Sequence, residues 1–129
     1  MSLNDCRKIV YDKLIALCPR VYYQQAPQGA VFPYVVFVFP TEGRQYKHQV
    51  ERMLEVNVYD SSVSGYNVAL EIENLTDSID KVLDYQTGNY GDIRAWFRRI
   101  GRTAIPYPSD SNIWRRELLY VYTTYNMGE

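Results

Sequence analysis

Histidine is almost absent from this chain, and its scarcity works against the commonest kinds of nucleophilic catalysis. His48 is the single histidine among 129 residues, so it would have to be the base of any Ser–His–Asp or Cys–His catalytic group. It lies in a polar segment between two expected strands, where an exposed turn histidine is the favoured interpretation. The two cysteines are far from His48, so they match no zinc-binding spacing and we expect no bound metal.

Long apolar runs and phosphate-binding motifs are missing as well. No apolar run approaches the ~20 residues of a membrane-spanning helix, and the N-terminus resembles no signal peptide. The sequence contains neither a Walker A motif nor a dinucleotide-binding fingerprint, so we expect no nucleotide cofactor. Cys6 and Cys18 would lie about 18 Å apart on one helix, beyond the roughly 7 Å limit for a disulfide. We therefore expect a soluble, cytosolic protein with reduced thiols.

The composition is that of an ordinary globular domain with two exceptions. Hydrophobic residues make up 47% of the chain, charged residues 22%, and the formal net charge is −1, so we expect one domain spanning residues 1–129. The first exception is the thirteen tyrosines, which suit half-buried strands and protein interfaces alike. The second is the segment 94–116, which holds six arginines but a single carboxylate, Asp110. Such a basic region can meet nucleic acid or an acidic patch on a neighbouring subunit.

Hydrophobic periodicity predicts two helices and a sheet. Apolar residues recur at three- and four-residue steps over 3–17 and 65–83, the pattern of amphipathic helices. Alternation and short apolar runs predict strands over 21–23, 34–39, 50–59, 93–103 and 114–125, with a continuation of the second strand over 44–46 left open. Neither alternating set within 93–103 is cleanly apolar, which indicates a β-bulge or a role between subunits.

The order of these elements indicates the fold class. Segments 86–91 and 104–112 have the glycine, proline and polar residues of loops. The remaining order is α-β-β-β-α-β-β. It predicts an α+β fold, in which an antiparallel or mixed sheet of about four to five strands carries both helices on one face.

Carboxylates on the second expected helix are one place to look for chemistry. Glu71, Glu73, Asp77 and Asp80 fall on its polar side. Residues three or four apart share a helix face, so a pair of them could hold Mg²⁺ or act as acid and base. A solvated helix face explains the same pattern without chemistry and is favoured.

Arginines next to aromatic residues are the strongest remaining signal, as in Trp96-Phe97-Arg98-Arg99 and Trp114-Arg115-Arg116. Tryptophan, tyrosine and arginine are enriched at the energetic centres of protein interfaces. Binders of single-stranded nucleic acid place the same residue types on a sheet, but no RNP-type motif is present here. A protein interface is the favoured interpretation, and nucleic-acid binding and an ordinary surface are the alternatives.

The segment around the first two strands resembles a known family. A helix ending in Pro19-Arg20-Val21-Tyr22 leads to Ala26-Pro27-Gln28-Gly29 and then to Phe32-Pro33-Tyr34-Val35-Val36, and a later strand ends in Val56-Asn57-Val58-Tyr59-Asp60. With the order of elements over nearly the whole chain, this run is similar to the tail terminator proteins of long-tailed phages and prophages. These are also called tail completion or head–tail joining proteins.

The resemblance implies a structural protein of the virion and no enzyme. Such proteins are α+β and form homo-hexameric rings that cap the tail tube. The implied partners are the major tail tube protein and the head–tail connector protein at the tail–head junction, with no membrane; DNA passes through the ring without sequence-specific binding. Before assembly the protein would lie in the host cytoplasm.

A set of side chains stands out as candidates to contact these partners. They come from the first loop and the two closing strands: Gln24, Gln25, Gln28, Arg98, Arg99, Trp114, Arg115 and Arg116. No catalytic, cofactor-binding or metal-binding residue is predicted. A nucleic-acid-binding module that uses the Trp- and Arg-bearing strands, or a small ligand-binding domain, is the alternative function.

Overall fold

Two helices and seven strands account for most of the described chain. A computed structural model describes residues 3–40, 42–46, 49–61, 68–91, 93–105 and 113–126. In chain order the elements are α1 (Leu3–Ile15), β1 (Val21–Tyr23), β2 (Tyr34–Val38), β3 (Glu42–Tyr46), β4 (Gln49–Ser61), α2 (Val68–Leu83), β5 (Thr87–Tyr90), β6 (Ile93–Ile105) and β7 (Ile113–Asn126).

The strands form one mixed sheet in the order β1-β2-β4-β7-β6-β5, with β3 paired to β4 outside this path. β1 and β2 run parallel, and the other described pairs are antiparallel. β4 and β7 pair without a break from Gln49↔Tyr125 to Ser61↔Ile113 and form the middle of the sheet. The α+β class is confirmed, and the sheet has seven strands where the sequence predicts about four to five.

Strand β5 corrects the predicted loop over 86–91. Its residues are mostly polar and include a glycine, so no alternation of apolar and polar residues predicts a strand there. They become one because the chain turns back along β6, where Gly88 pairs with Ala95 and Tyr90 with Ile93. α1 packs against this edge strand. Pairing with β7 likewise extends β6 to Ile105, two residues into the predicted loop 104–112.

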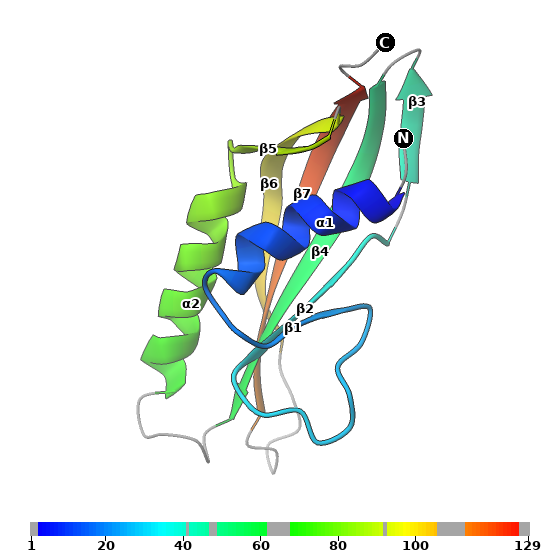
Figure 1. Ribbon diagram of the computed structural model, residues 1–129. Helices are drawn as coiled ribbons and strands as arrows, with labels where there is room; N and C mark the ends of the chain where they lie inside the picture. The colour runs from blue at the N-terminus through cyan, green and yellow to red at the C-terminus, as the bar shows by residue number, and fades with distance from the viewer. Residues whose placement is uncertain are drawn as a thin grey trace.

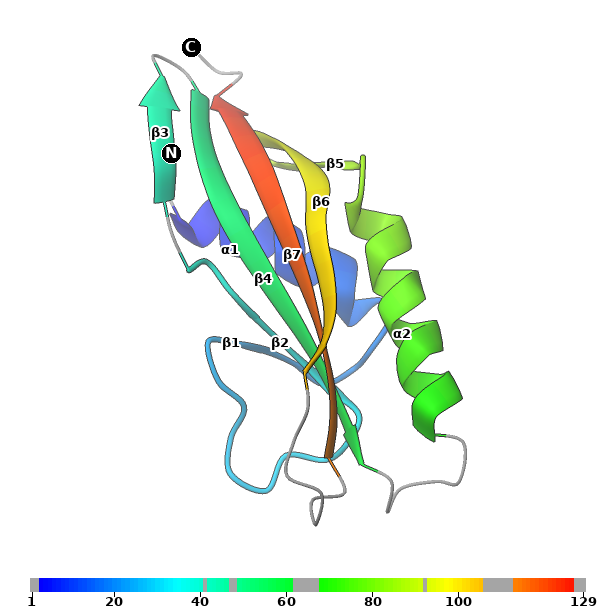
Figure 2. The ribbon, with the colours of Figure 1, turned by 180° about the vertical axis from the view of Figure 1, so that it is seen from behind.

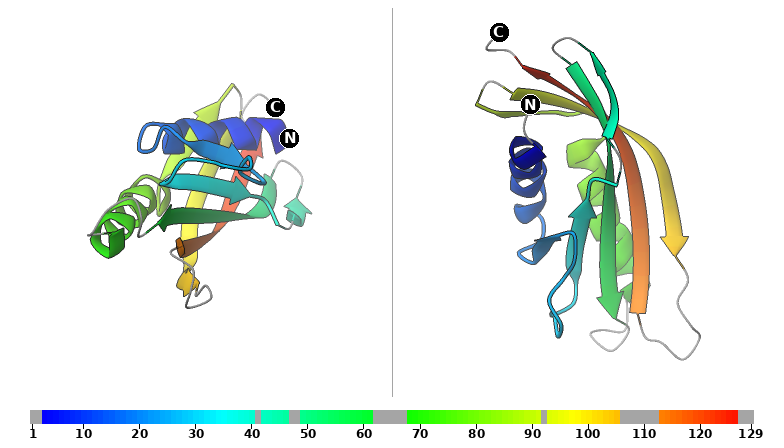
Figure 3. Two further views of the ribbon diagram at one scale, coloured as in Figure 1. Left: turned by 90° about the horizontal axis from the view of Figure 1, so that it is seen from below. Right: turned by 90° about the vertical axis from the view of Figure 1, so that its right-hand side faces the viewer.

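Both helices lie on the same face of the sheet, as the sequence predicts. α1 crosses in front of the strands in Figure 1 and behind them in Figure 2, and α2, drawn beside the strands in both views, packs against β4, β6 and β7. α2 follows the direction of the long strands, whereas α1 crosses over the sheet. Figure 3 shows that the sheet is curved and that the strand ends near β5 bend over α1. The helices therefore fill the hollow side of the sheet, which we call the helix face; the other side is the open face.

The apolar core lies between the helices and the sheet. α1 contributes Cys6, Val10 and Leu14 at four-residue steps, all buried. α1 ends at Ile15, two residues earlier than predicted, and the N–H groups of Leu17 and Cys18 both donate to the Leu14 carbonyl just before the proline. Further fully buried side chains come from α2 and the long strands, among them Ile79, Leu83, Leu54, Val56, Val58, Phe97, Leu118, Tyr120 and Tyr122. Both cysteine thiols are buried and free.

A β-bulge in β6 explains the irregular alternation of that segment. The register shifts between Arg99 and Gly101, so Ile100 is the extra residue. Before the bulge Arg99 pairs with Tyr120, and after it Arg102 pairs with Leu118. Two arginines three positions apart are thus brought to the helix face.

Candidate interaction surface

The predicted arginines divide between the two faces of the sheet. Successive residues of a strand point to opposite faces, so Arg98 and Arg99 are separated, as are Arg115 and Arg116. Arg99 pairs in register with the fully buried Tyr120 and therefore lies on the helix face. Arg98 and Arg115 lie on the open face.

On the helix face, Arg99 is bonded to α2 through Asp80. Its Nη1 donates to Asp80 Oδ2 at 2.8 Å, and the Tyr120 hydroxyl donates to Oδ1 of the same carboxylate at 2.7 Å. The Arg99 backbone N–H donates to Asp84 Oδ1 at 2.8 Å. Burial, with the hydrogen bond to Asp80, raises the pKa of Tyr120 well above its ordinary value, so its hydroxyl remains a neutral donor. Arg99 is therefore engaged within the subunit.

Glu73 of α2 gathers two further arginines from different strands. Arg102 donates to Glu73 Oε2 at 2.7 Å and to Asp77 Oδ1 at 2.6 Å, while Arg116 Nε donates to Glu73 Oε1. The hydrogen bond from Arg116, assisted by Arg102, holds the pKa of the Glu73 carboxyl below its ordinary value against the opposing effect of burial. The Arg116 guanidinium also lies over the Trp114 ring, 5.8 Å from its centroid. These strands and α2 are thereby joined by a shared ion-pair network.

These contacts correct the interpretation of the α2 carboxylates as a simple solvated face. Glu73, Asp77 and Asp80 each accept a hydrogen bond from an arginine. Glu71 is exposed and has no such partner among the described residues. Arginine occupies oxygens that a Mg²⁺ ion would use, and the described part of the chain contains no His, Cys, Asp or Glu cluster that could hold a metal.

A row of tyrosine rings crosses the open face. Tyr34 and Tyr59 pair in register between β2 and β4 and stack with 5.0 Å between ring centroids. Tyr22 on β1 meets Tyr34 edge-on at 6.0 Å. Arg115 on β7 is the next residue in register and holds its guanidinium 5.5 Å from the Tyr59 centroid. The row thus joins four neighbouring strands and ends in a cation.

Arg115 is held firmly in place on this face. Its Nη2 and Nε both donate to Asn57 Oδ1, at 2.8 and 3.0 Å. Its Nη2 also lies 3.7 Å from Glu55 Oε1 and 3.6 Å from Glu117 Oε2. This part of the open face therefore presents an ordered cation between two carboxylates.

Arg98 stands in a more apolar part of the open face. It is exposed and makes no hydrogen bond or ion pair to another residue that the structure describes. Trp96 and Ile100 on the same strand are 36% and 50% exposed, and the half-buried Leu119 and Val121 lie beside them on β7. An unpaired arginine among accessible large apolar side chains is the composition of an interface centre.

The loop after β1 borders the tyrosine row. Gln24 and Gln25 help to line a hollow of about 290 Å³ whose walls include Tyr34 and Tyr59. Gln24 has a φ of 71°, a left-handed conformation uncommon for residues with a side chain. Gln28 is exposed further along the loop.

The structure therefore brings together some of the predicted residues and separates others. Arg98 and Arg115 share the open face with Gln24 and Gln25 at its border, whereas Arg99, Trp114 and Arg116 face the helices. Sequence reasoning missed Tyr22 and Tyr34 as parts of this surface. The richness in tyrosine was a signal, but only the strand register shows that three of them are neighbours.

Two remaining predictions have different outcomes. His48 and the turn that carries it lie outside the described residues. Of the helices in the described part of the chain, neither is long and apolar enough to cross a membrane.

The same fold occurs in solved structures. The chain superposes on a chain from the virion of a native gene transfer agent particle with a TM-score of 0.69 and 13% sequence identity, covering 95% of this chain and 96% of that one. A second solved chain gives a TM-score of 0.64 and 16% identity over 96% of both chains. No protein-family model and no curated protein sequence matches. At these identities the likeness shows a shared fold.

Proposed function

We propose that this protein is a structural subunit of a phage-like virion that caps the tail tube and joins the tail to the head connector. The observation that carries the proposal is the likeness in fold, over nearly the whole of both chains, to a component of a gene transfer agent virion. The resemblance of the segment from α1 to β2 to tail terminators indicates the same place in a particle. The protein would act through contacts and without catalysis.

The open face is the surface best suited to these contacts. Arg98 is available there, Arg115 is held in position, and large apolar side chains surround the first of them. Arginine and aromatic anchors of this kind dominate the energy of protein interfaces. Arg99, Arg102 and Arg116 on the helix face are already bonded to carboxylates of α2, so they are less suited to a partner.

The subunits would associate head to tail in a ring, and the resemblance implies a hexamer. Head-to-tail contacts close into rings when the rotation permits, and they need two different complementary patches on one subunit. The arginine-bearing open face and carboxylates elsewhere on the surface can supply such patches. In this arrangement the ring would contact the tail tube protein and the head connector, and DNA would pass through its centre.

Charge reversal at the two open-face arginines tests this proposal. We expect Arg98→Glu with Arg115→Glu to abolish ring formation on tail tubes and the joining of tails to heads. Electron microscopy of an assembly extract that lacks the wild-type protein would count joined particles. Lys81→Glu, a charge reversal at an exposed α2 residue, is the control that should leave joining intact. Normal joining by a correctly folded double variant would refute the placement of the contact.

A nucleic-acid-binding function is the second candidate, and the β5–β6 edge favours it. Tyr85 and Trp96 are accessible and lie 6.2 Å apart between ring centroids, with the exposed Arg94 and Arg98 on the same strand as Trp96. Binding of short single-stranded DNA over a salt titration decides it, because phosphate contacts give a steep dependence on salt. A steep slope that Arg94→Glu with Arg98→Glu reduces would favour this candidate over the assembly role of Arg98.

A further inference from the structure

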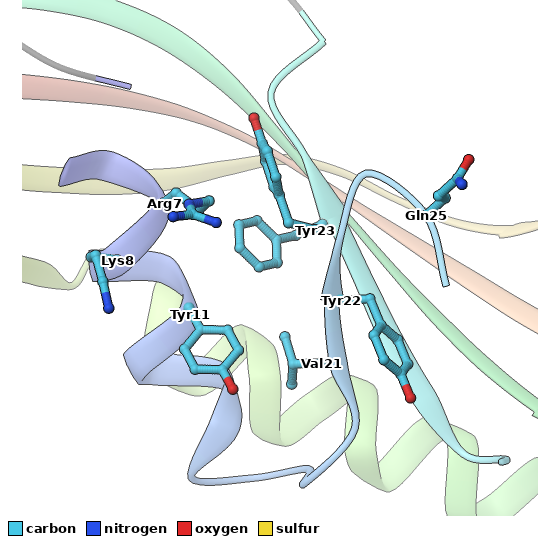
Figure 4. Close-up of a pocket in the computed structure, with 8 residues that line it drawn as sticks. Arg7, Lys8, Tyr11, Val21, Tyr22, Tyr23 and Gln25 are labelled. Carbon is cyan, nitrogen blue, oxygen red and sulfur yellow. The ribbon is translucent and has the colours of Figure 1, made fainter. Parts of the chain in front are cut away.

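A groove of about 360 Å³ lies between α1 and the edge strand β1, apart from the arginines of the open face. Figure 4 shows Arg7, Lys8 and Tyr11 of α1 on one side of it and Val21 and Tyr23 of β1 on the other. The groove therefore has cations on one wall and a strand with aromatic side chains on the other.

Among the described residues, the charged side chains that line this groove are all positive. Arg7 and Lys8 line it, and none of the residues that line it is a carboxylate. Arg7 Nε is buried with no hydrogen-bond partner, while its guanidinium lies over the Tyr23 ring, 5.7 Å from the centroid. A carboxylate that enters the groove would meet both of these cationic side chains. The groove is complementary to a carboxylate.

The strand that forms the other wall has a free edge. β1 is the last strand of the sheet and pairs on one side only, with β2. The carbonyl of Arg20 and the N–H of Gln24 are both bonded to β2. Since alternate residues of a strand turn toward the same neighbour, Val21 and Tyr23 direct their backbone groups to the free edge. The Gln25 N–H donates to the Tyr23 carbonyl, and the other backbone groups of these two residues have no hydrogen-bond partner among the residues that the structure describes.

We propose that this groove binds an extended acidic segment of a partner protein, which adds as a strand to the free edge of β1. Strand addition supplies backbone hydrogen bonds, and pockets for alternate side chains supply specificity. Carboxylates of the segment would meet Arg7 and Lys8, and its apolar side chains would pack against Tyr11 and Tyr23. The site does not depend on the open face, so it can be tested independently of the tail-capping role.

A displayed peptide library tests the proposal without knowledge of the partner. Random decapeptides on the yeast surface are selected with the wild-type protein, and binders that also bind Arg7→Glu with Lys8→Glu are discarded. We expect the survivors to alternate acidic and apolar residues and to lack proline. A synthetic survivor labelled with fluorescein then gives a Kd by fluorescence anisotropy.

The affinities of matched variants separate this site from general attraction. Lys8→Glu, a change at an exposed residue, should weaken the peptide at least about tenfold, as expected for a lost charged contact. Arg94→Glu with Arg98→Glu changes more charge elsewhere and should leave the Kd within about twofold, because these side chains lie outside the groove. A peptide N-methylated at alternate residues should lose binding, since it cannot donate to β1.

Amide exchange measured by nuclear magnetic resonance completes the test. The Val21 and Tyr23 amides should become protected when the peptide is bound. The proposal would be overturned if the library gives no acidic binders, if Lys8→Glu binds the peptide as tightly as the wild type, or if protection appears at another edge such as β5.

Discussion

The two faces of the β6–β7 pair carry the same residue types and use them differently. On the helix face, Arg99 and Arg116 are bonded to carboxylates of α2. On the open face, Arg98 has no partner in the part of the chain that the structure describes. Leu118 and Leu119 show the same contrast, because the first is fully buried and the second half-buried. Residues adjacent in the sequence are thus assigned to opposite sides of one sheet.

The difference indicates which surface is complete within the subunit. On the helix face, two helices cover the apolar side chains, and carboxylates of α2 pair with Arg99, Arg102 and Arg116. Each ion pair between half-exposed side chains contributes at most about 1 kcal/mol, so the apolar core supplies most of the stability and the ion pairs fix how α2 sits. The open face has no such cover from the described residues, which is why we assign the partner contacts to it.

The largest expected contrast is between the two neighbouring leucines. Leu118→Ala removes a fully buried side chain beneath the helices and should lower the free energy of unfolding by about 2–5 kcal/mol. Leu119→Ala on the open face should lower it by no more than about 1 kcal/mol, because that side chain already contacts solvent. Urea unfolding followed by circular dichroism measures both. Equal losses would mean that the two faces are equally important to the isolated subunit.

Substitutions of two glycines, one near each face, should differ in their effect on the free energy of unfolding by an intermediate amount. A Cβ on Gly88 would lie 2.4 Å from Ile9 Cγ2 and 3.0 Å from Lys13 Cε, so Gly88→Ala should separate β5 from α1 and cost about 1–3 kcal/mol. On the open face, a Cβ on Gly101 would meet only the Leu119 Cβ, at 3.8 Å. Gly101→Ala should therefore change stability by less than about 0.5 kcal/mol. Thermal unfolding measures the stability of both variants. If Gly101→Ala proved more destabilising than Gly88→Ala, the packing of α1 on β5 would be contradicted.

The smallest expected effect concerns the ion-pair network of the helix face. Because the pKa of the Glu73 carboxyl is lowered from its ordinary 4.5 in the folded protein, its contribution is present above that value and lost as the pH falls through the lowered pKa. Glu73→Gln should be less stable than the wild type at pH 7, by no more than about 1 kcal/mol for this half-exposed group. The difference should shrink when the same comparison is made at an acid pH, as the Glu73 carboxyl becomes protonated.

The neighbouring exposed carboxylate provides the control for this pH dependence. Glu71→Gln removes the charge of a carboxylate that has no arginine partner among the described residues, so it should stay within about 0.5 kcal/mol of the wild type at pH 7. The midpoints of urea unfolding at neutral and acid pH give the relative stabilities of the wild type and the two variants. A Glu73→Gln deficit that persists unchanged in acid would show that packing, and not the charge, makes the contribution.

Local patterns in the sequence were sufficient for most elements of the fold. The helices follow from apolar residues at three- and four-residue steps, and the long strands β4 and β7 from alternation. The irregular alternation over 93–103 indicated a β-bulge or a role between subunits, and the register shows the bulge at Ile100. β5 was beyond this reasoning, because it exists through its pairing with β6 and its contact with α1, and neither is visible in four polar residues.

The sequence by itself determined that adjacent arginines of a strand lie on opposite faces of the sheet, because the side chains of a strand alternate with a period of two residues. This applies to Arg98 and Arg99 and to Arg115 and Arg116. Which face would receive α2, and with it the partners of Arg99 and Arg116, was decided only by the tertiary structure. The tyrosine row depended on it too, since Tyr22, Tyr34 and Tyr59 are far apart in the chain. The physical reason is the same in both cases: contacts between distant segments depend on strand order and register, which local patterns do not encode.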